Sequence, residues 1–239
     1  MHRWIGGPLL LGSLAVGLAA CGGSGGSGSA GSGPPDNGEA AKPVHQIGQD
    51  VEAAMKGLKS FHIAGSVTDT GQTIGLDLVV ENSGPGGGKM TIDGSAFQLV
   101  VNGSKIYFKG DQSFWQKAGG VNASVAGLFA GKWVTGVPGS SDLEGLAQLT
   151  NVNSFVSGLA SGSDSGTNAT KGAVSTFRGQ RALPIRSSEG TAWVAATGKP
   201  YLLALEGGSQ ANLTFDEFNS APAPAVPSNA VDFGNLSGS

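Results

Sequence analysis

The sequence predicts an α+β fold in which one large, curved antiparallel β-sheet forms a half-barrel and helices cover its concave apolar face. Two observations lead to this prediction. Apolar and polar residues alternate along many short segments, and two regions of helical spacing, one early and one in the middle, stand apart from those segments. Runs of strands with segregated helices are typical of α+β proteins. The foldable part, residues 44–233, has the length of one domain.

The first 20 residues have the pattern of a signal peptide. Arg3 precedes an apolar run that is short, contains glycine and ends in small residues. Leu18-Ala19-Ala20-Cys21 matches the bacterial lipobox, in which the precursor is cut before a cysteine whose sulfur carries a diacylglycerol. Cys21 is the only cysteine and is therefore the candidate lipid-attachment residue. There are two alternatives. The chain is either a secreted protein with an ordinary cleavage site or a protein with a single N-terminal anchor helix.

Residues 21–43 are expected to form a disordered tether behind the lipidated cysteine. The segment contains mainly Gly, Ser and Ala, followed by prolines and mixed charges. Such a chain buries too little apolar surface to offset the entropy of ordering it. Residues 234–239 are expected to be a disordered tail.

The folded domain is expected to begin with a helix and then five strands. Apolar residues recur at helical spacing over Gln46–Ser60. Alternation with period two follows in FHIAGSVTD, TIGLDLVVE, GKMTIDG, AFQLVVN and SKIYFKG. Asn102-Gly103, between the last two of these segments, is a strong hairpin signal. Each segment has one apolar and one polar face, which indicates an antiparallel meander with one side in water.

The middle of the chain, residues 111–160, is expected to form short helices. Its large apolar residues are often three or four positions apart, and many glycines weaken the helices. Strands resume in TKGAVSTFRG, QRALPIRSS, GTAWVAATG, PYLLALEGG and ANLTFDEFN, ahead of the proline-rich stretch Ala221–Pro227.

The composition excludes several classes of function. Seventeen acidic and fourteen basic residues give a net charge of −3, and only Arg3 precedes Cys21, so the part after it is slightly more acidic. The sequence has no basic stripe of the kind that binds nucleic acid. It also has no polybasic patch of the kind that binds anionic lipid headgroups. His45 and His62 lie in different segments without metal-ligand spacing, so we expect no metal and no cofactor.

The sequence also gives no indication of an enzyme. The only match to G-x-S-x-G, Gly22 to Gly26, lies in the tether, without the strand and helix that a nucleophile elbow requires. Carboxylate pairs such as Asp216-Glu217 have no neighbouring base or metal signature. We therefore expect no catalytic residues.

Four segments, together with the lipobox, resemble a known group of proteins in their order and spacing. They are AMKGLKSFH (Ala54–His62), VVNGSKIYFKG (Val100–Gly110), GTAWVAATGKPYLLAL (Gly190–Leu205) and ANLTFDEFN (Ala211–Asn219). The chain resembles the LolA/LolB-like fold and, within it, the LppX/LprG-type lipoproteins of actinobacteria, over most of residues 42–232. The resemblance implies a half-barrel closed by helices around a hydrophobic cavity. In relatives that cavity takes acyl chains of phospholipids, acylated glycolipids, triacylglycerols or lipoproteins, which are carried or presented without catalysis.

The candidate cavity residues are the inward positions of the alternating strands and the apolar positions of the middle helices. Every half-buried strand shows the same alternation, so a plain core is the competing interpretation. The candidates are Ile74, Leu76, Leu78, Met90, Ile92, Phe97, Leu99, Val101, Ile106 and Phe108 from the sheet, and Phe114, Leu128, Phe129, Leu146, Leu149 and Phe155 from the helices.

Apart from Arg3, all arginines fall within nine residues: Arg178, Arg181 and Arg186. They are interpreted either as donors to a phosphate or sugar headgroup at the cavity mouth or as a solvated hairpin face.

The leading hypothesis is a monomeric lipoprotein, held on the extracytoplasmic face of the cell membrane by its diacylglycerol, that carries or presents a hydrophobic ligand. An envelope transporter or another envelope protein is a candidate partner. The alternative is a tethered interaction or sensor-accessory module of the same fold with a filled cavity. Large residues able to fill a cavity keep the alternative open: Phe97, Phe108, Trp115, Trp133 and Trp193.

Overall fold

The structure is a computed structural model. It describes residues 35–69, 71–92, 94–117, 121–136, 145, 147–162, 169–208 and 211–233. The predicted signal peptide, residues 21–34 of the predicted tether, Leu146 and the predicted tail 234–239 lie outside the described residues.

The described residues form one open sheet of 13 strands. The first half of the chain contributes β1 (Ser60–Asp69), β2 (Gln72–Glu81), β3 (Gly86–Ile92), β4 (Ser95–Asn102), β5 (Lys105–Gly110) and β6 (Val134–Thr135). The second half contributes β7 (Thr170–Lys171), β8 (Ser175–Phe177), β9 (Gln180–Ser187), β10 (Gly190–Ala195), β11 (Leu202–Glu206), β12 (Ala211–Asp216) and β13 (Val231–Asp232).

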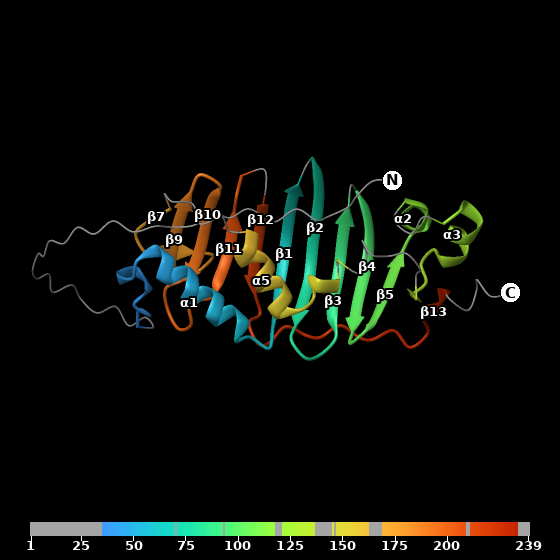
Figure 1. Cartoon of the computed structure of the whole chain (residues 1–239), viewed down its shortest axis with the longest axis horizontal. Helices are drawn as coiled ribbons and strands as arrows, with labels where there is room; N and C mark the ends of the chain where they lie inside the picture. Colours follow the sequence, from blue (N-terminus) through green and yellow to red (C-terminus); the bar gives the residue numbers. More distant parts are fainter. Residues whose placement is uncertain are drawn as a thin grey trace, which may run out of the picture.

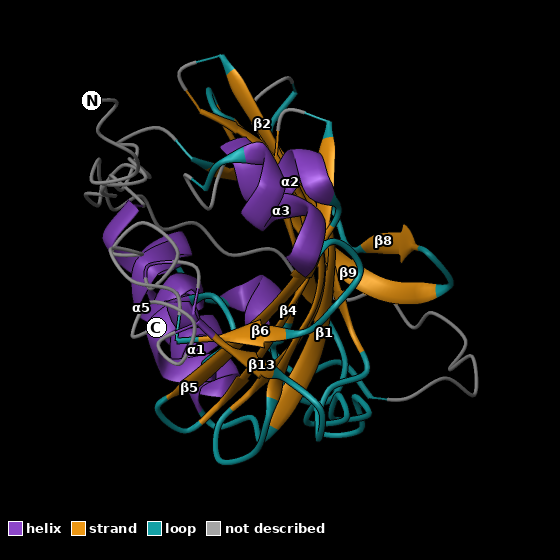
Figure 2. Cartoon of the chain, turned by 90° about the vertical axis from the view of Figure 1, so that its right-hand side faces the viewer, coloured by secondary structure: helices purple, strands orange, loops and turns teal. Residues whose placement is uncertain are grey.

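The helices lie on one face of this sheet (Figures 1 and 2). They are the short η1 (Glu39–Ala41), α1 (Val44–Lys56), α2 (Gln112–Lys117), α3 (Ala123–Phe129) and α5 (Val152–Gly162). Figure 1 shows α1 in front of β9–β11, α5 in front of β12 and β1, and α2 and α3 beside β5. The predicted α+β class, a curved sheet with helices over one face, is confirmed.

Two antiparallel meanders meet in the middle of the sheet. The strand order is β13-β6-β5-β4-β3-β2-β1-β12-β11-β10-β9-β7, so β1 pairs with β2 on one side and with β12 on the other. Ile63 of β1 lies opposite Leu78 and Phe215 in the two registers. The pairing of β13 with β6 is parallel, which makes the sheet mixed rather than entirely antiparallel as expected.

The main core lies between the concave face and the helices. Phe61, near the start of β1, is completely buried and contacts the rings of Phe155 in α5 and Phe215 in β12, with centroids 5.6 and 6.0 Å away. A second core cluster lies under α1, where Ile47 packs with Leu183 of β9 and Val194 of β10. The apolar stripe of α1 therefore covers the second meander, while α5 covers the junction.

The domain begins earlier than expected, which corrects the predicted tether boundary at residue 43. The backbone N–H of Asn37 donates to the carbonyl of Ala196 at 2.9 Å, and its side chain donates to the carbonyl of Ala195 at 2.8 Å. Glu39 is buried, and its carboxylate accepts from Lys42 Nζ at 2.8 Å. Hydrogen bonds to the β10–β11 connection, rather than apolar burial, hold this segment, so its composition did not indicate order.

Two other boundaries differ from expectation. The first helix ends at Lys56 and not at Ser60, because Gly57 caps it and Ser60 already belongs to β1, although Leu58 is still buried. Val134, predicted at the end of a helix, lies in β6 and pairs with Phe108 of β5. Val134 is buried and extends the sheet by pairing with β5. This pairing is long-range, so the spacing of nearby residues could not indicate it.

Removing the Phe61 ring is predicted to lower the free energy of unfolding by about 3–5 kcal/mol, because it leaves a cavity at the junction of both meanders and α5. Phe61→Ala should show this loss in urea denaturation followed by tryptophan fluorescence. Lys89→Ala, at an exposed position of β3, is the control and should change the free energy by less than about 0.5 kcal/mol. Equal effects of the two substitutions would contradict the central position of Phe61.

Candidate functional site

The candidate site is the concave face of the sheet together with the helices above it. Among the predicted residues, nine are buried in the main core cluster: Leu76, Leu78, Met90, Phe97, Leu99, Phe108, Phe114, Phe129 and Phe155. Five more are half-buried and pack against it: Ile74, Ile92, Val101, Ile106 and Leu149. The structure thus brings these residues together in one apolar layer.

Leu128 does not belong to this layer, which corrects its prediction as a lining residue. It exposes 59% of its surface on α3. Ala126 and Phe129 form the buried face of that helix, so Leu128, one residue before Phe129, points away from the sheet. Leu146 lies outside the described residues.

Aromatic rings fill the layer under α2 and α3. Phe97 stacks on Phe114 at a centroid distance of 4.6 Å, and Trp115 contacts Phe114 and Phe129 at 5.0 and 5.3 Å. Gly110 makes room for this packing, because a Cβ there would lie 2.3 Å from the Phe114 ring. Trp115 is completely buried and its indole N–H has no hydrogen-bond partner. An unpaired N–H costs free energy, so the packing of the rings has to offset that cost.

A half-buried apolar rim lies at one end of the concave face. Val67, Ile74 and Ile92 are neighbours across β1, β2 and β3, and all three pack against the core cluster while keeping part of their surface exposed. Figure 1 shows these ends of β1, β2 and β3 extending beyond α5. The rim is one of the places where partly exposed apolar side chains border the core cluster.

The helix α5 is fixed at its N-terminal end. The backbone N–H of Glu81 donates to the carbonyl of Thr150 at 2.9 Å, and Asn153 Nδ2 donates to Asn82 Oδ1 at 2.9 Å. Asn151 caps the helix by accepting from the N–H of Ser154 at 3.1 Å. Phe155 and Val156 then hold the helix on the sheet through apolar contacts. Its first turn is therefore tied to the end of β2.

Several residues of the layer were not among the predicted ones. Phe61, Ile63, Leu213 and Phe215 are at most 4% exposed and lie at the β1–β12 junction. The alternation in FHIAG and ANLTFD indicates these residues, because it has the same period of two as the segments that contain the predicted ones. The pairing of the two distant strands was not readable from spacing.

The face of the sheet opposite the helices, called the outer face below, has a charged cluster on β1, β2 and β12. His62 of β1 lies between Asp216 of β12 and Asp77 of β2, with Nδ1–Oδ1 and Nε2–Oδ1 distances of 2.8 and 3.0 Å. Partial burial lowers the pKa of His62, but the hydrogen bonds to the two carboxylates outweigh it, so the pKa is raised above about 6.5. Among the described residues, no cluster of His, Cys, Asp and Glu could hold a metal ion.

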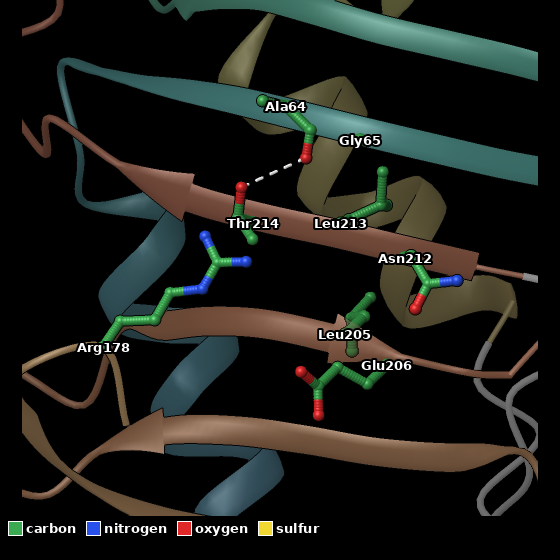
Figure 3. A pocket seen from close by; sticks show the side chains of 8 residues that line it. All are labelled: Ala64, Gly65, Arg178, Leu205, Glu206, Asn212, Leu213 and Thr214. Carbon is green, nitrogen blue, oxygen red and sulfur yellow. Dashed lines mark hydrogen bonds between the residues drawn. The ribbon is translucent and has the colours of Figure 1, made fainter. Parts of the chain in front are cut away.

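The three clustered arginines do not form one site. Arg178 lines a hollow of the outer face between β1, β11 and β12 (Figure 3). Arg186 lines a different hollow, at the turns that end β9 and β11. Arg181 lies 3.6 Å from Asp36 of the N-terminal segment. Neither hollow lies in the apolar layer, so the cluster does not frame a mouth of that layer.

The overall fold is shared with a solved structure. LprF from Mycobacterium bovis matches with a TM-score of 0.50 and 15% sequence identity, over 83% of this chain and 100% of the LprF chain. The chain has an LppX/LprG-like fold. The resemblance predicted from the sequence is therefore confirmed at the level of the LppX/LprG-like fold. No protein-family model and no curated protein matches the chain. Within the described residues, every helix is too short or too polar to span a bilayer.

The His62 cluster predicts a pH-dependent contribution to stability. Because the folded pKa is raised, this contribution is fully present below about pH 6.5 and is lost as the pH rises through the folded value. The unfolding free energy of the native chain minus that of His62→Gln should therefore decrease from pH 5.5 to pH 9 in urea titrations. A difference that stays constant, or that grows with pH, would contradict the assignment.

Proposed function

We propose that the chain is a lipid-anchored protein of the cell envelope whose folded domain binds the acyl chain of a hydrophobic ligand on the concave face. The rim of Val67, Ile74 and Ile92 carries the proposal, because it leads from the surface into one continuous apolar layer. Each methylene removed from water contributes about 0.8 kcal/mol, so a sixteen-carbon chain supplies roughly 10 kcal/mol before ordering costs. The LppX/LprG-like fold supports the same function.

The helices above this layer suit a surface that opens. Gly158 lies within α5, and a glycine in a helix interior costs about 1 kcal/mol relative to alanine. α2 and α3 are only six and seven residues long, below the length at which helices are stable without tertiary packing. We infer that α5 pivots at Thr150–Asn153, where its hydrogen bonds to β2 and to the β2–β3 connection lie, and that an acyl chain enters between its other end and the rim.

A tethered module without a ligand is the second candidate. The rings of Phe97, Phe108, Phe114 and Trp115 favour it, because they occupy the layer under α2 and α3. The hollows lined by Arg178 and by Arg186 both lie outside the layer. Of the bulky residues proposed to fill a cavity, Trp193 packs against Phe177 of β8 and in a cluster separate from the main core, so it does not fill the layer.

A charge in the rim is predicted to remove bound lipid without unfolding the domain. Ile74→Glu places a carboxylate where the acyl chain would enter, and the amount of lipid per chain should fall at least fivefold. Thr73→Glu is the matched control, since Thr73 is the exposed neighbour that points to the outer face. The measurement is mass spectrometry of organic extracts from chains purified from a host with native envelope lipids.

The native chain must carry stoichiometric lipid in that experiment. Native chains that carry none would favour the ligand-free module. Equal lipid in Ile74→Glu and Thr73→Glu, with unchanged melting temperatures, would show that the rim is not the entrance.

The anchor at Cys21 is tested separately. Cys21→Ser is expected to leave the precursor at full length and without lipid, because no sulfur remains to carry the diacylglycerol; gel mobility and mass spectrometry of the membrane fraction measure both. Ser24→Ala, three residues later in the same segment, is the control and should be processed normally. A Cys21→Ser protein of mature size would contradict the lipoprotein assignment.

A further inference from the structure

The outer face contains a hollow of about 240 Å³ that the concave-face function does not use. It is lined by Ala64 and Gly65 of β1, Asn212, Leu213 and Thr214 of β12, Leu205 and Glu206 of β11, and Arg178. Figure 3 shows the side chains of Arg178, Glu206, Asn212 and Thr214 around it, with α1 and α5 behind the strands. One cation, one carboxylate, one amide and one hydroxyl therefore face a common space.

The hollow exists because its floor lacks bulk. Ala64 has only a methyl group on the outer face, and Gly65 allows a close approach of β12, since a Cβ there would lie 1.9 Å from the Asn212 carbonyl oxygen. The hydroxyl of Thr214 donates to the carbonyl of Ala64 at 3.2 Å. The small floor thus stands between larger polar walls.

Arg178 occupies a backbone position that does not favour arginine. It is the first of the two residues between β8 and β9, with φ = 50°, and Gly179 follows with φ = 82°. Two residues with positive φ form the tight hairpin turn in which Asn-Gly is the preferred pair. A non-glycine residue in this region costs about 1 kcal/mol, and such strain gathers at functional positions. The turn geometry does not favour an arginine, so the role of the Arg178 side chain explains why an arginine is found at this position.

An aromatic pair fixes both charged groups of the hollow. Phe177 stacks on Trp193 with centroids 4.4 Å apart, and the Arg178 guanidinium lies 5.6 Å from the Phe177 ring. The indole N–H of Trp193 donates to Glu206 Oε2 at 2.8 Å, which leaves Oε1 for another donor. Asn212 donates to the carbonyl of Gly208 at 2.7 Å, which leaves its amide oxygen as an acceptor. The donors and acceptors are thus held in place before any ligand binds.

We propose that this hollow binds a single neutral sugar ring, so that the outer face attaches the domain to a saccharide. Vicinal hydroxyls both donate and accept, so one pair can accept from the Arg178 fork while another donates to Glu206. An anion would meet the Glu206 carboxylate, and a cation would meet Arg178. The volume lies below the 300–1,000 Å³ of pockets for drug-sized ligands, which suits one ring. The site is independent of acyl-chain binding on the concave face.

Saturation-transfer NMR on the full chain in detergent micelles tests the proposal. The probes are the methyl glycosides of glucose, mannose, galactose and arabinose, with sodium acetate as an anionic probe. At least one glycoside should receive saturation from the native chain. The signal should fall at least tenfold in Arg178→Asn and in Glu206→Gln, and should persist in the control Arg186→Gln, which alters the other hollow.

Arg178→Asn and Glu206→Gln are both expected to keep the fold. Asn is favoured at the positive φ of position 178, so the melting temperature of Arg178→Asn should be equal or higher. Gln at position 206 keeps an oxygen for the Trp193 N–H, which tryptophan fluorescence will report. No transfer to any glycoside from the native chain would overturn the proposal, as would glycoside signals unchanged in both variants. Acetate binding that strengthens in Glu206→Gln, without glycoside binding, would identify an anion site instead and would also overturn it.

Discussion

The structure depends on covering the apolar face of one open sheet. A sheet with one apolar face must bury it, and this chain does so with helices drawn from two places in its sequence. Phe61 lies where the requirement is strongest, since the two meanders join at β1 and α5 packs over the junction. The contact of Phe61 with Phe155 and Phe215 links the two halves of the sheet to the helical layer.

The two faces of the sheet differ in chemistry, and this difference separates their roles. The concave face combines aliphatic side chains with two groups of rings and reaches the surface at the rim of Val67, Ile74 and Ile92. The outer face has the His62 cluster with its two carboxylates and the hollow beside Arg178. Because successive side chains of a strand point to opposite faces, a single sheet can present an apolar surface to the helices and hydrogen-bonding groups on the outer face.

The helical layer is less firmly held than the sheet. The long strands β1 and β2 share ladder pairs along their full length, whereas the hydrogen bonds of Asn153 and Asn151 lie at the first turn of α5. The buried indole N–H of Trp115 without a partner adds a cost to the packing under α2 and α3. A layer of this kind can separate locally while the sheet stays intact.

Much of the fold was readable from the sequence because alternation has a fixed consequence. A period of two fixes which side chains share a face, so the inward residues from Ile74 to Phe108 were predicted in the correct layer. Long-range pairing has no such signal, which is why Phe61 and Phe215 were missed as partners. Leu128 was misplaced because helical spacing alone did not fix which side of α3 faces the sheet. Hydrogen bonds, not apolar residues, order the N-terminal segment at Asn37, so its composition predicted a tether.

The residues that line the Arg178 hollow could not be grouped from the sequence either. The three arginines are close together in the sequence, but their side chains lie in different places. Arg178 and Arg186 line different hollows, and Arg181 lies beside Asp36 of the N-terminal segment. The aromatic pair of Phe177 and Trp193 that fixes Arg178 and Glu206 joins residues 16 positions apart, across two strands. Tertiary pairing, not local pattern, creates that site.

The central claim, an apolar layer whose helical cover opens for an acyl chain, is tested most directly by hydrogen–deuterium exchange of the full chain with and without palmitoyl-oleoyl phosphatidylglycerol vesicles. Amides in the second half of α5 are expected to exchange far faster than those of β1, and the vesicles are expected to slow them while leaving β1 unaffected. Exchange of α5 at the same rate as β1, with no change when vesicles are added, would contradict it.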